Sequence, residues 1–488
     1  MRIEFTDKTG TVKENFIQSL VLLYLPCESF AVDDCGENKL KITAGFENGE
    51  YFANAELTIA DKKAEASLKC PKDDSKKLQI KNLIGKTFLE AAEKVFGYKS
   101  PWGIFTGIRP AKIASDYLRS NSAEDTKRIL CDEYMFLPQK ADICIKTAEN
   151  EMRLTDNLEA KSCSLYISVP FCPSKCRYCS FVSSTTPRLL SLIPEYLKEM
   201  CGELSDIAKT VKELGLSLKT IYVGGGTPAI LEADQIKLIA ECVNSCFDMK
   251  DVSEFTFEAG RPDCITKEKL DAIAQSGIDR ISINTQTAND DILRSVGRKH
   301  TFSNYLECMN MAREAGIKCI NTDLIAGLPG ESTESFFDSV NRVMEANPEN
   351  ITVHSFTLKK SSEFKTTNTA EIDANSRAAR EMVSYSADRL MGAGYEPYYM
   401  YRQKNTVGNL DNTGYAKHGT ECLYNIYMMG EYHTVFAAGA GAVTKYVSSD
   451  RQRIERSFCP KYPYEYLDKE KYKGFDRKFA FDFYNNLY

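Results

Sequence analysis

The amino-acid sequence predicts an α/β protein organised around six β/α units. From residue 160 to about 360, short strand-like runs alternate six times with longer helix-like segments. Parallel strands need crossover connections, which helices supply, so this rhythm predicts a parallel sheet covered by helices. Periodicity alone does not decide between a partial barrel and an open sheet. Residues 1–155 are expected to form an N-terminal α/β module, and residues 361–488 a C-terminal domain that closes the mouth of the core.

The N-terminal module begins with strands. Residues 39–44 and 51–59 alternate apolar and polar side chains as half-exposed strands do, with glycines at the turn between them. In residues 78–96 the apolar side chains recur at helical spacing. A turn-rich segment follows, and its Arg109 is expected either to be a solvated residue of a domain-closing loop or to meet an anion.

The β/α region provides the core of the fold. Its helix-like segments are amphipathic: Leu197, Met200 and Leu204 are spaced by three and four residues, which places them on one face that packs on a sheet. Ligands of parallel α/β sheets gather at the carboxyl ends of the strands, so side chains at those ends deserve a functional interpretation. The expected strands comprise residues 165–169, 220–223, 254–258, 280–284, 318–325 and 351–356.

Three cysteines follow the first of these strands on a loop. Cys172, Cys176 and Cys179 have the spacing C-x3-C-x2-C, so their thiolates can hold one metal centre. A structural zinc site takes four protein ligands, and so does a 4Fe-4S cluster that only passes electrons. Three cysteines therefore indicate a cluster in which one iron is left open for another ligand.

Further polar or glycine-rich motifs follow the other strands. The glycine run 224–228 comes after the second strand, Glu258 ends the third, Gln286 follows the fourth and Asp323 lies in the fifth. Glycines let a backbone approach a ligand closely and adopt positive φ. Each motif alone is typical of a tight turn or a solvated strand end. Together, at successive strand ends, they predict one ligand site.

This set of motifs resembles that of the radical S-adenosylmethionine (radical SAM) enzymes. Within them it is similar to the oxygen-independent coproporphyrinogen III oxidase group, and the long N-terminal module and residues 398–405 resemble its coproporphyrinogen dehydrogenase branch, HemZ. The resemblance implies a partial, TIM-like (β/α)6 barrel over residues 160–360. The segments that carry it are the cysteine loop, residues 224–228, Glu258, residues 280–282, residues 297–300 and residues 321–330.

The resemblance also implies ligand roles. The three cysteines would hold a 4Fe-4S cluster whose open iron binds the amino and carboxylate groups of S-adenosyl-L-methionine, and an electron from the cluster would cleave that cofactor to a 5′-deoxyadenosyl radical. Gly225, Gly226 and Thr227 would pair with the amino group. The residues expected at the ribose, the carboxylate or a second cofactor molecule are Glu258, Gln286, Arg298 and Asp323.

Two main functions follow from the resemblance. One is the oxygen-independent oxidative decarboxylation of coproporphyrinogen III to protoporphyrinogen IX in anaerobic haem biosynthesis, with an electron donor such as flavodoxin or ferredoxin. Oxidases with that chemistry carry a fourth cysteine two residues after the third, where this sequence has Phe181. The ending C-x2-C-x-F resembles the haem chaperones, so a cluster protein that binds haem without decarboxylating is the alternative. Methyl transfer to a tetrapyrrole is a third possibility.

The segment after residue 390 offers residues for a tetrapyrrole. Tyr398, Tyr399 and Tyr401, followed by Arg402 and Lys404, would suit a flat macrocycle that bears carboxylates, or would simply pack as an ordinary strand. A haem chaperone could use His433 as an iron ligand, although a hydrogen-bonded structural histidine is expected there.

Composition narrows the function classes. The chain has 488 residues and a net charge of −6, so it lacks the basic footprint of a nucleic-acid-binding protein. We find no apolar run long enough to span a bilayer, which predicts a cytoplasmic protein. Seventeen cysteines, mostly scattered singly, fit a reducing compartment better than a disulfide framework. Cys201 and Cys242 are accordingly expected to be small buried hydrophobic residues.

Overall fold

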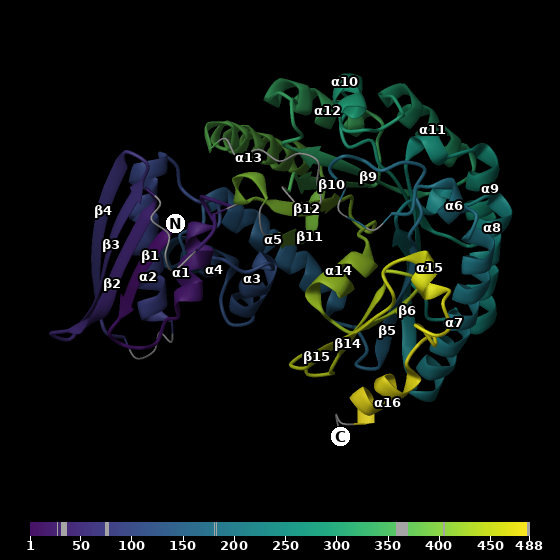
Figure 1. Cartoon of the computed structure of the whole chain (residues 1–488), viewed down its shortest axis with the longest axis horizontal. Coiled ribbons are helices and arrows are strands. Elements are labelled where there is room, and N and C mark those ends of the chain that lie inside the picture. The colour runs from purple at the N-terminus through teal and green to yellow at the C-terminus, as the bar shows by residue number, and fades with distance from the viewer. Residues whose placement is uncertain are drawn as a thin grey trace.

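Two β-sheets organise the part of the chain that the structure describes. The computed structural model describes residues 1–26, 28–30, 37–73, 78–179, 181, 183–357, 369–403 and 406–485, except the side chains of 369–374. In these residues the strands form one sheet in the order β1-β2-β3-β4 and a second in the order β11-β12-β10-β9-β8-β7-β6-β5-β13-β14-β15. Figure 1 shows the small sheet at one end of the molecule and the large, curved sheet at the other.

The small sheet lies within the predicted N-terminal module. Its strands β2 and β3 alternate buried with exposed residues, and the buried side chains of both strands belong to the same apolar core as helix α2. Strand β1 pairs parallel with β2, and the other pairs are antiparallel. The elements are β1 (Arg2–Asp7), α1 (Glu14–Val21), β2 (Lys39–Glu47), β3 (Glu50–Ile59), β4 (Lys62–Pro71) and α2 (Gln79–Phe96).

Three further helices of this region pack on one another, and the first and the third of them also contact the large sheet. They are α3 (Pro110–Leu118), α4 (Ala123–Tyr134) and α5 (Pro138–Thr155), and their buried residues, such as Leu130 and Ile143, share the apolar core of the barrel. Asn150 of α5 donates a hydrogen bond to Pro397 O of β11 at 3.0 Å. The boundaries of the three predicted domains remain predictions.

The six predicted strands form the centre of the large sheet. They are all parallel, and neighbours in the chain are neighbours in the sheet, which confirms the predicted β/α rhythm and the partial barrel. Helices surround them as an outer arc (Figure 1). The strands are β5 (Ser162–Val169), β6 (Ser217–Gly225), β7 (Glu254–Gly260), β8 (Arg280–Ile283), β9 (Cys319–Ala326) and β10 (Asn350–Ser355). The helical segments between them are α6 (Pro187–Leu190), α7 (Ile193–Glu213), η1 (Pro228–Ile230), α8 (Ala233–Cys246), η2 (Pro262–Cys264), α9 (Lys267–Gln275), α10 (Asp290–Ser295), α11 (Phe302–Glu314) and α12 (Thr333–Glu345).

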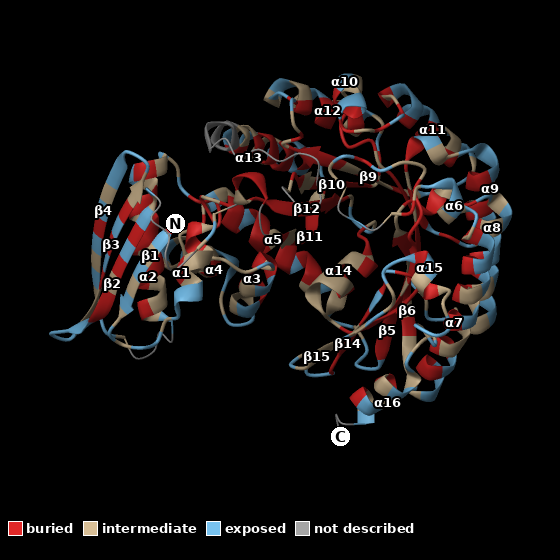
Figure 2. Ribbon diagram, in the orientation of Figure 1, coloured by how far each residue is buried: buried red, intermediate tan, exposed pale blue. Residues whose placement is uncertain are grey.

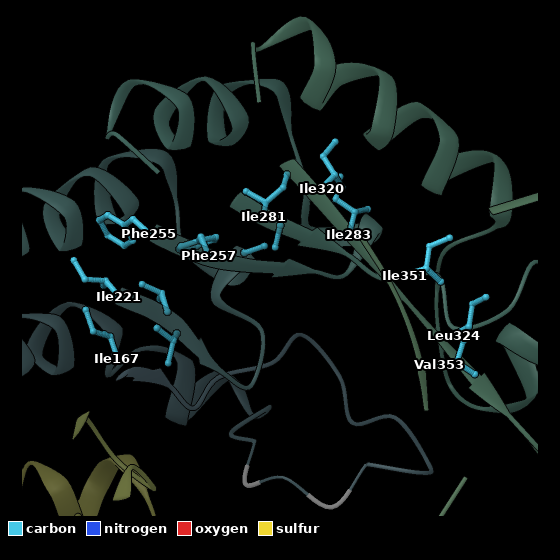
Figure 3. Packing of buried hydrophobic residues seen from close by; sticks show 14 of the residues in the cluster. Ile167, Ile221, Phe255, Phe257, Ile281, Ile283, Ile320, Leu324, Ile351 and Val353 are labelled. Carbon is cyan, nitrogen blue, oxygen red and sulfur yellow. The ribbon is translucent and has the colours of Figure 1, made fainter. Parts of the chain in front are cut away.

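Alternate residues of these strands face opposite sides. Side chains such as Ile167, Ile221, Phe257 and Val353 lie between the strands and the outer helices (Figure 3). Their neighbours along the strands point to the interior of the barrel, as the two-residue period of a strand requires. Figure 2 shows the consequence: the central strands are buried, and the exposed residues lie on the outer surfaces of the helices.

The C-terminal segment extends both edges of the central sheet. Strands β12 and β11 add antiparallel to β10, whereas β13 pairs parallel with β5 and leads into the antiparallel pair β14 and β15. The sequence analysis expected a C-terminal domain over the barrel mouth and did not foresee this shared sheet. The elements are α13 (Thr369–Gly392), β11 (Glu396–Arg402), η3 (Val407–Asn409), β12 (Asp411–Ala416), α14 (Leu423–Gly430), β13 (Thr434–Ala438), β14 (Val443–Val447), β15 (Ile454–Phe458), α15 (Pro463–Tyr466) and α16 (Arg477–Asn485).

The expectation for two cysteines was wrong. Cys201 of α7 and Cys242 of α8 form a disulfide between neighbouring helices, and both are half-buried rather than fully buried. In the described residues, no helix is long and apolar enough to cross a membrane.

A buried ion pair joins α5 to the C-terminal extension of the sheet. Lys140 Nζ lies 2.6 Å from Asp411 Oδ1, and the two side chains are only 6% and 1% exposed. Burial alone would raise the pKa of Asp411, but the charge and hydrogen bond of Lys140 hold that pKa below its ordinary value. Removing one partner of such a pair leaves the other charge buried and uncompensated.

We therefore expect Lys140→Met to lower the free energy of unfolding by about 3–5 kcal/mol. Lys146→Met is the matched control, because Lys146 pairs with Glu396 at 3.1 Å on the surface of the same helix. That pair is more than one-third exposed, so its loss should cost less than about 1 kcal/mol. Urea unfolding followed by circular dichroism measures both variants, and equal losses would contradict the assignment of Lys140.

Candidate active site

A cavity of about 900 Å³ lies at the carboxyl ends of the barrel strands. All ten residues predicted for the cluster and the cofactor line it, from six separate segments of the chain. Their ligand roles stay predictions. The structure thus brings together every residue that the strand-end pattern had selected: Cys172, Cys176, Cys179, Gly225, Gly226, Thr227, Glu258, Gln286, Arg298 and Asp323.

The cysteine loop folds back on the end of β5. Cys172 N donates a hydrogen bond to Ser184 O at 3.1 Å, and Cys179 N donates to Cys176 O at 3.0 Å, which closes a turn. Cys172 and Cys176 are buried and Cys179 is half-buried. Thr227 Oγ1 lies 3.3 Å from Cys172 Sγ, so the glycine run after β6 is in direct contact with the loop.

The glycine run can approach the cysteine loop because it lacks side chains. A Cβ atom on Gly226 would lie 2.5 Å from Phe171 O and 2.9 Å from Cys172 Sγ, closer than such atoms approach in proteins. Gly225 has a φ of 115°, a conformation that side chains disfavour. The two positions therefore require glycine.

Arg261 fixes the cysteine loop from the end of β7. Its Nη1 donates to Ser174 O at 3.1 Å and to Ser174 Oγ at 3.0 Å, and it lies 3.7 Å from Cys176 Sγ. Asp263 holds the guanidinium in place, with Nη2 2.7 Å from its carboxylate. The sequence analysis missed Arg261, although its position just after a strand end is a signal that could have revealed it.

Two acidic side chains face the cavity from neighbouring parts of the sheet. Glu258 accepts a hydrogen bond from Tyr222 Oη at 2.5 Å, and burial raises the pKa of its carboxyl to about 7 against the effect of that bond. His354 Nε2 lies 3.7 Å from Asp323 Oδ2. Burial alone would raise the pKa of Asp323, but the interaction with His354 lowers it. His354, at the end of β10, was also missed by the sequence analysis.

Gln286 and Arg298 are held by backbone contacts. Gln286 has a φ of 74°, which is unusual for a residue with a side chain, and its backbone bonds to Asp323 O and Ile325 N at 2.9 Å extend the sheet locally. Arg298 Nε donates to Tyr178 Oη at 3.1 Å, and its Nη1 donates to Asn284 O at 3.2 Å. The backbone of Gln286 and the side chain of Arg298 are thus fixed at the cavity wall.

Tyrosines make up one wall of the cavity. Tyr166, Tyr222 and Tyr424 stack on one another, with the rings of Tyr222 and Tyr424 4.5 Å apart between centroids. Tyr399 and Tyr401, from the predicted tetrapyrrole segment, line the cavity as well.

Other predicted tetrapyrrole contacts are structural. Tyr398 is buried, and Arg402 donates to Phe105 O at 2.6 Å and to Gly107 O at 3.2 Å, so it ties β11 to the segment before α3. Lys404 lies outside the described residues. His433 is buried, with its ring nitrogens 2.8 Å from Ser162 Oγ and 2.7 Å from Ser164 Oγ, as expected of a hydrogen-bonded structural histidine.

The cysteine geometry discriminates between kinds of metal centre. In the part of the chain that the structure describes, no three His, Cys, Asp or Glu side chains lie close enough to share one metal ion. A 4Fe-4S cluster is larger than a single ion, and its thiolates bind different irons, so its cysteines stand farther apart. Three cysteines that face one cavity, beside a glycine that leaves space next to Cys172, fit such a cluster, and they are one ligand short of the four protein ligands that a structural zinc site takes.

Comparison with known proteins places this site in a family. The Radical SAM superfamily profile matches residues 166–343. The oxygen-independent coproporphyrinogen-III oxidase-like protein HemZ of Bacillus subtilis is 35% identical over 80% of this chain and 79% of its own length. The heme chaperone HemW of Haemophilus influenzae is 29% identical over 65% of this chain and 80% of its own length. The solved structure of coproporphyrinogen III oxidase HemN from Escherichia coli, a radical SAM enzyme, has a TM-score of 0.46 at 20% sequence identity. The similarity covers 62% of this chain and 70% of the HemN chain.

The superfamily profile and the match to HemZ establish the family that the cysteine loop and the strand-end motifs indicated. The superfamily uses a 4Fe-4S cluster and S-adenosyl-L-methionine, so both predicted cofactors are confirmed. The match to HemZ extends well beyond the barrel into both flanking regions. The chain belongs to the radical SAM superfamily and, within it, to the oxygen-independent coproporphyrinogen III oxidase group, on the HemZ branch.

Proposed function

We propose that this protein oxidatively decarboxylates coproporphyrinogen III to protoporphyrinogen IX in anaerobic haem biosynthesis. The observation that carries the proposal is the convergence of the cysteine loop, the glycine run and two carboxyls on one tyrosine-walled cavity, in a chain that resembles HemZ over four-fifths of its length. At about 900 Å³ the cavity lies near the top of the range of roughly 300–1,000 Å³ for small-molecule sites. It therefore offers space for a large substrate beside a cofactor.

In this proposal the cysteine loop holds the cluster. Cys172, Cys176 and Cys179 would ligate the cluster, and Arg261 places a positive charge beside Cys176 Sγ. When bound, the cluster and S-adenosyl-L-methionine supply a carbon-centred radical that removes a hydrogen atom from the substrate. The chain positions these groups and keeps competing reactants out.

The cavity residues orient the cofactor. The backbone at Gly225 and Gly226, together with Thr227, receives the amino group of the methionine part. Among the remaining predicted residues, Glu258 and Asp323 accept hydrogen bonds from ribose hydroxyls, while Arg298 pairs with a carboxylate. These roles are supported by the placement of all the side chains around one cavity.

The overall chemistry balances for each propionate side chain. The propionate loses one hydrogen atom from the carbon next to the ring and then loses CO2, which leaves a vinyl group and one electron. A one-electron acceptor takes that electron, and a donor such as a flavodoxin or ferredoxin would supply the electron that each turnover requires. Two such events convert coproporphyrinogen III to protoporphyrinogen IX.

A haem chaperone is the second candidate, and one residue favours it. Phe181 stands where a fourth cysteine would follow the loop; it is 69% exposed and lines the cavity. The chain is also 29% identical to a protein named as a heme chaperone. Under this alternative the cavity takes haem, and no carboxylate is lost.

The two candidates predict different products. With the cluster reconstituted anaerobically, coproporphyrinogen III, S-adenosyl-L-methionine, a reductant and an electron acceptor should yield vinyl-bearing porphyrins, detected by chromatography after oxidation. We expect one 5′-deoxyadenosine for each CO2 lost. Formation of 5′-deoxyadenosine without decarboxylated product, together with stoichiometric haem binding, would instead establish the chaperone.

Cys176→Ala is the control for this assay. It should lose most of its iron and all cofactor cleavage, because two thiolates cannot hold the cluster firmly. Cys308→Ala removes a cysteine that is buried between α11 and the rest of the barrel and does not line the cavity, so it should keep its iron. A Cys176→Ala protein that still cleaved S-adenosyl-L-methionine would contradict the shared basis of both candidates.

The carboxyl of Glu258 predicts a pH dependence of cofactor binding. Its pKa of about 7 means that it is mostly protonated at pH 6 and mostly ionised at pH 8. If the ionised form accepts the ribose hydroxyls, the affinity for S-adenosylhomocysteine, a stable cofactor analogue, should rise up to roughly tenfold over that range. Isothermal titration calorimetry on the cluster-loaded protein measures this affinity at each pH.

Two variants assign this dependence. Glu258→Gln should bind with nearly the same affinity at both pH values. His354→Asn should keep the dependence, with its midpoint moved to higher pH, because the positive charge of His354 lowers the pKa of Glu258 in the unmodified protein. If the affinity lost its pH dependence in His354→Asn but kept it in Glu258→Gln, the titrating group would be His354 and not Glu258.

A further inference from the structure

The hairpin of β14 and β15 turns one face towards the cavity. Val443 lies opposite Phe458, and Lys445 lies opposite Arg456, in the antiparallel register of the two strands. Residues two apart on a strand share a face, so the two cross-strand pairs lie side by side on one surface. All four side chains line the cavity. We call these four residues the hairpin face.

The cationic half of the hairpin face carries unbalanced charge. Lys445 Nζ and Arg456 Nη2 lie 3.7 and 3.8 Å from the same oxygen, Glu431 Oε1. The other oxygen of Glu431 is 2.6 Å from Arg109 Nη1. Three cations therefore share one carboxylate, and like charges directly opposite each other on a hairpin destabilise it. Burial, together with the neighbouring Arg456 and Arg109, lowers the pKa of Lys445.

The apolar half of the hairpin face is exposed. Phe458 is 69% exposed and Val443 is 36% exposed, although both line a cavity. Met428 and Met429 of α14 line the same region, and methionine side chains adapt well to a flat apolar ligand. An apolar patch beside two cations thus remains uncovered inside a site that is large enough for a tetrapyrrole.

We propose that the hairpin face binds the tetrapyrrole, with Val443 and Phe458 against the macrocycle and with Lys445 and Arg456 paired with its propionate carboxylates. This assignment rests on the proposed function and adds the residues that grip the substrate. A carboxylate ligand supplies the charge that the shared Glu431 cannot, and the aromatic ring of Phe458 packs on an apolar plane.

The position of the hairpin indicates which carboxylates it holds. Strand β13 pairs parallel with β5, so both run towards the cysteine loop, and β14 runs back from that end. Lys445 lies two residues, or roughly 7 Å, farther from the loop than Val443. The cations therefore hold propionates remote from the one that reacts beside the cofactor, while the macrocycle spans the distance between them.

The test is a binding titration that needs neither cofactor cleavage nor a reductant. The cluster-loaded protein is titrated with coproporphyrin III, the oxidised and stable form with four carboxylates, and with its tetramethyl ester in the same dilute detergent. Quenching of porphyrin fluorescence reports binding. The variants are Lys445→Gln/Arg456→Gln and Phe458→Ala. Arg453→Gln removes a cation from the same hairpin that pairs with Glu455 and does not line the cavity.

We expect the double variant to weaken coproporphyrin III binding on the order of tenfold or more and to leave the ester unaffected. Phe458→Ala should weaken the binding of both ligands, and Arg453→Gln should weaken the binding of neither. Lys445→Arg should retain binding of the acid, and added salt should weaken the acid more than the ester. The proposal is overturned if the double variant binds the acid as the unmodified protein does, or if the unmodified protein binds neither ligand.

This experiment separates the inference from the proposed function. If decarboxylation fails but binding of the acid depends on Lys445 and Arg456, the hairpin face remains a site for a carboxylate-bearing tetrapyrrole and the chaperone gains support. If decarboxylation succeeds and the double variant binds normally, only the assignment of the hairpin face is lost.

Discussion

The two-residue period of the barrel strands is the constraint on which the site depends. Each strand buries one set of side chains against the outer helices and turns the other set inward. Ile221 therefore packs in the apolar core, whereas its neighbour Tyr222 lines the cavity. A shift of one residue in the register of a strand would exchange the two sets. The apolar layer in Figure 3 therefore determines which polar side chains reach the cavity.

The strands at the two edges of the large sheet contribute further residues to the cavity wall. Strand β11 brings Tyr399 and Tyr401 to the cavity, and the strands that follow β13 bring the hairpin face to it. Contacts that are remote in sequence hold these edges, among them Lys140 with Asp411 and Arg402 with the carbonyl of Phe105. Integrity of the site thus depends on segments outside the barrel core.

Local patterns made much of the fold and the site predictable. Cysteine spacing, the glycine run and polar residues at strand ends are each visible within a few positions of one another, and parallel strands place their carboxyl ends at one edge. The same rule would have identified His354, which ends the sixth strand. Alternation could not decide between the two roles left open for Arg402, because it does not reveal which face of a strand is covered by another segment.

Contacts between distant segments could not be predicted from one sequence. Arg261 bonds to Ser174, 87 positions away, and only the curvature of the barrel brings the end of β7 beside the cysteine loop. The disulfide of Cys201 and Cys242 depends on the packing of two neighbouring helices. The pairing of Lys445 with Arg456 depends on the register of a hairpin whose turn has no strong sequence signal.

The charges around the cavity explain how a symmetric-looking ligand can be oriented. Glu258 and Asp323 lie on β7 and β9, whereas Lys445 and Arg456 lie on strands beyond β5, at the other side of the sheet order. Under the proposed function, the propionate carboxylates of the tetrapyrrole would be attracted to Lys445 and Arg456. The carboxylates of Glu258 and Asp323 can then accept hydrogen bonds from hydroxyl groups. Under the proposed function, this arrangement would hold the ribose-bearing cofactor at Glu258 and Asp323 and the polycarboxylate ligand at the hairpin face.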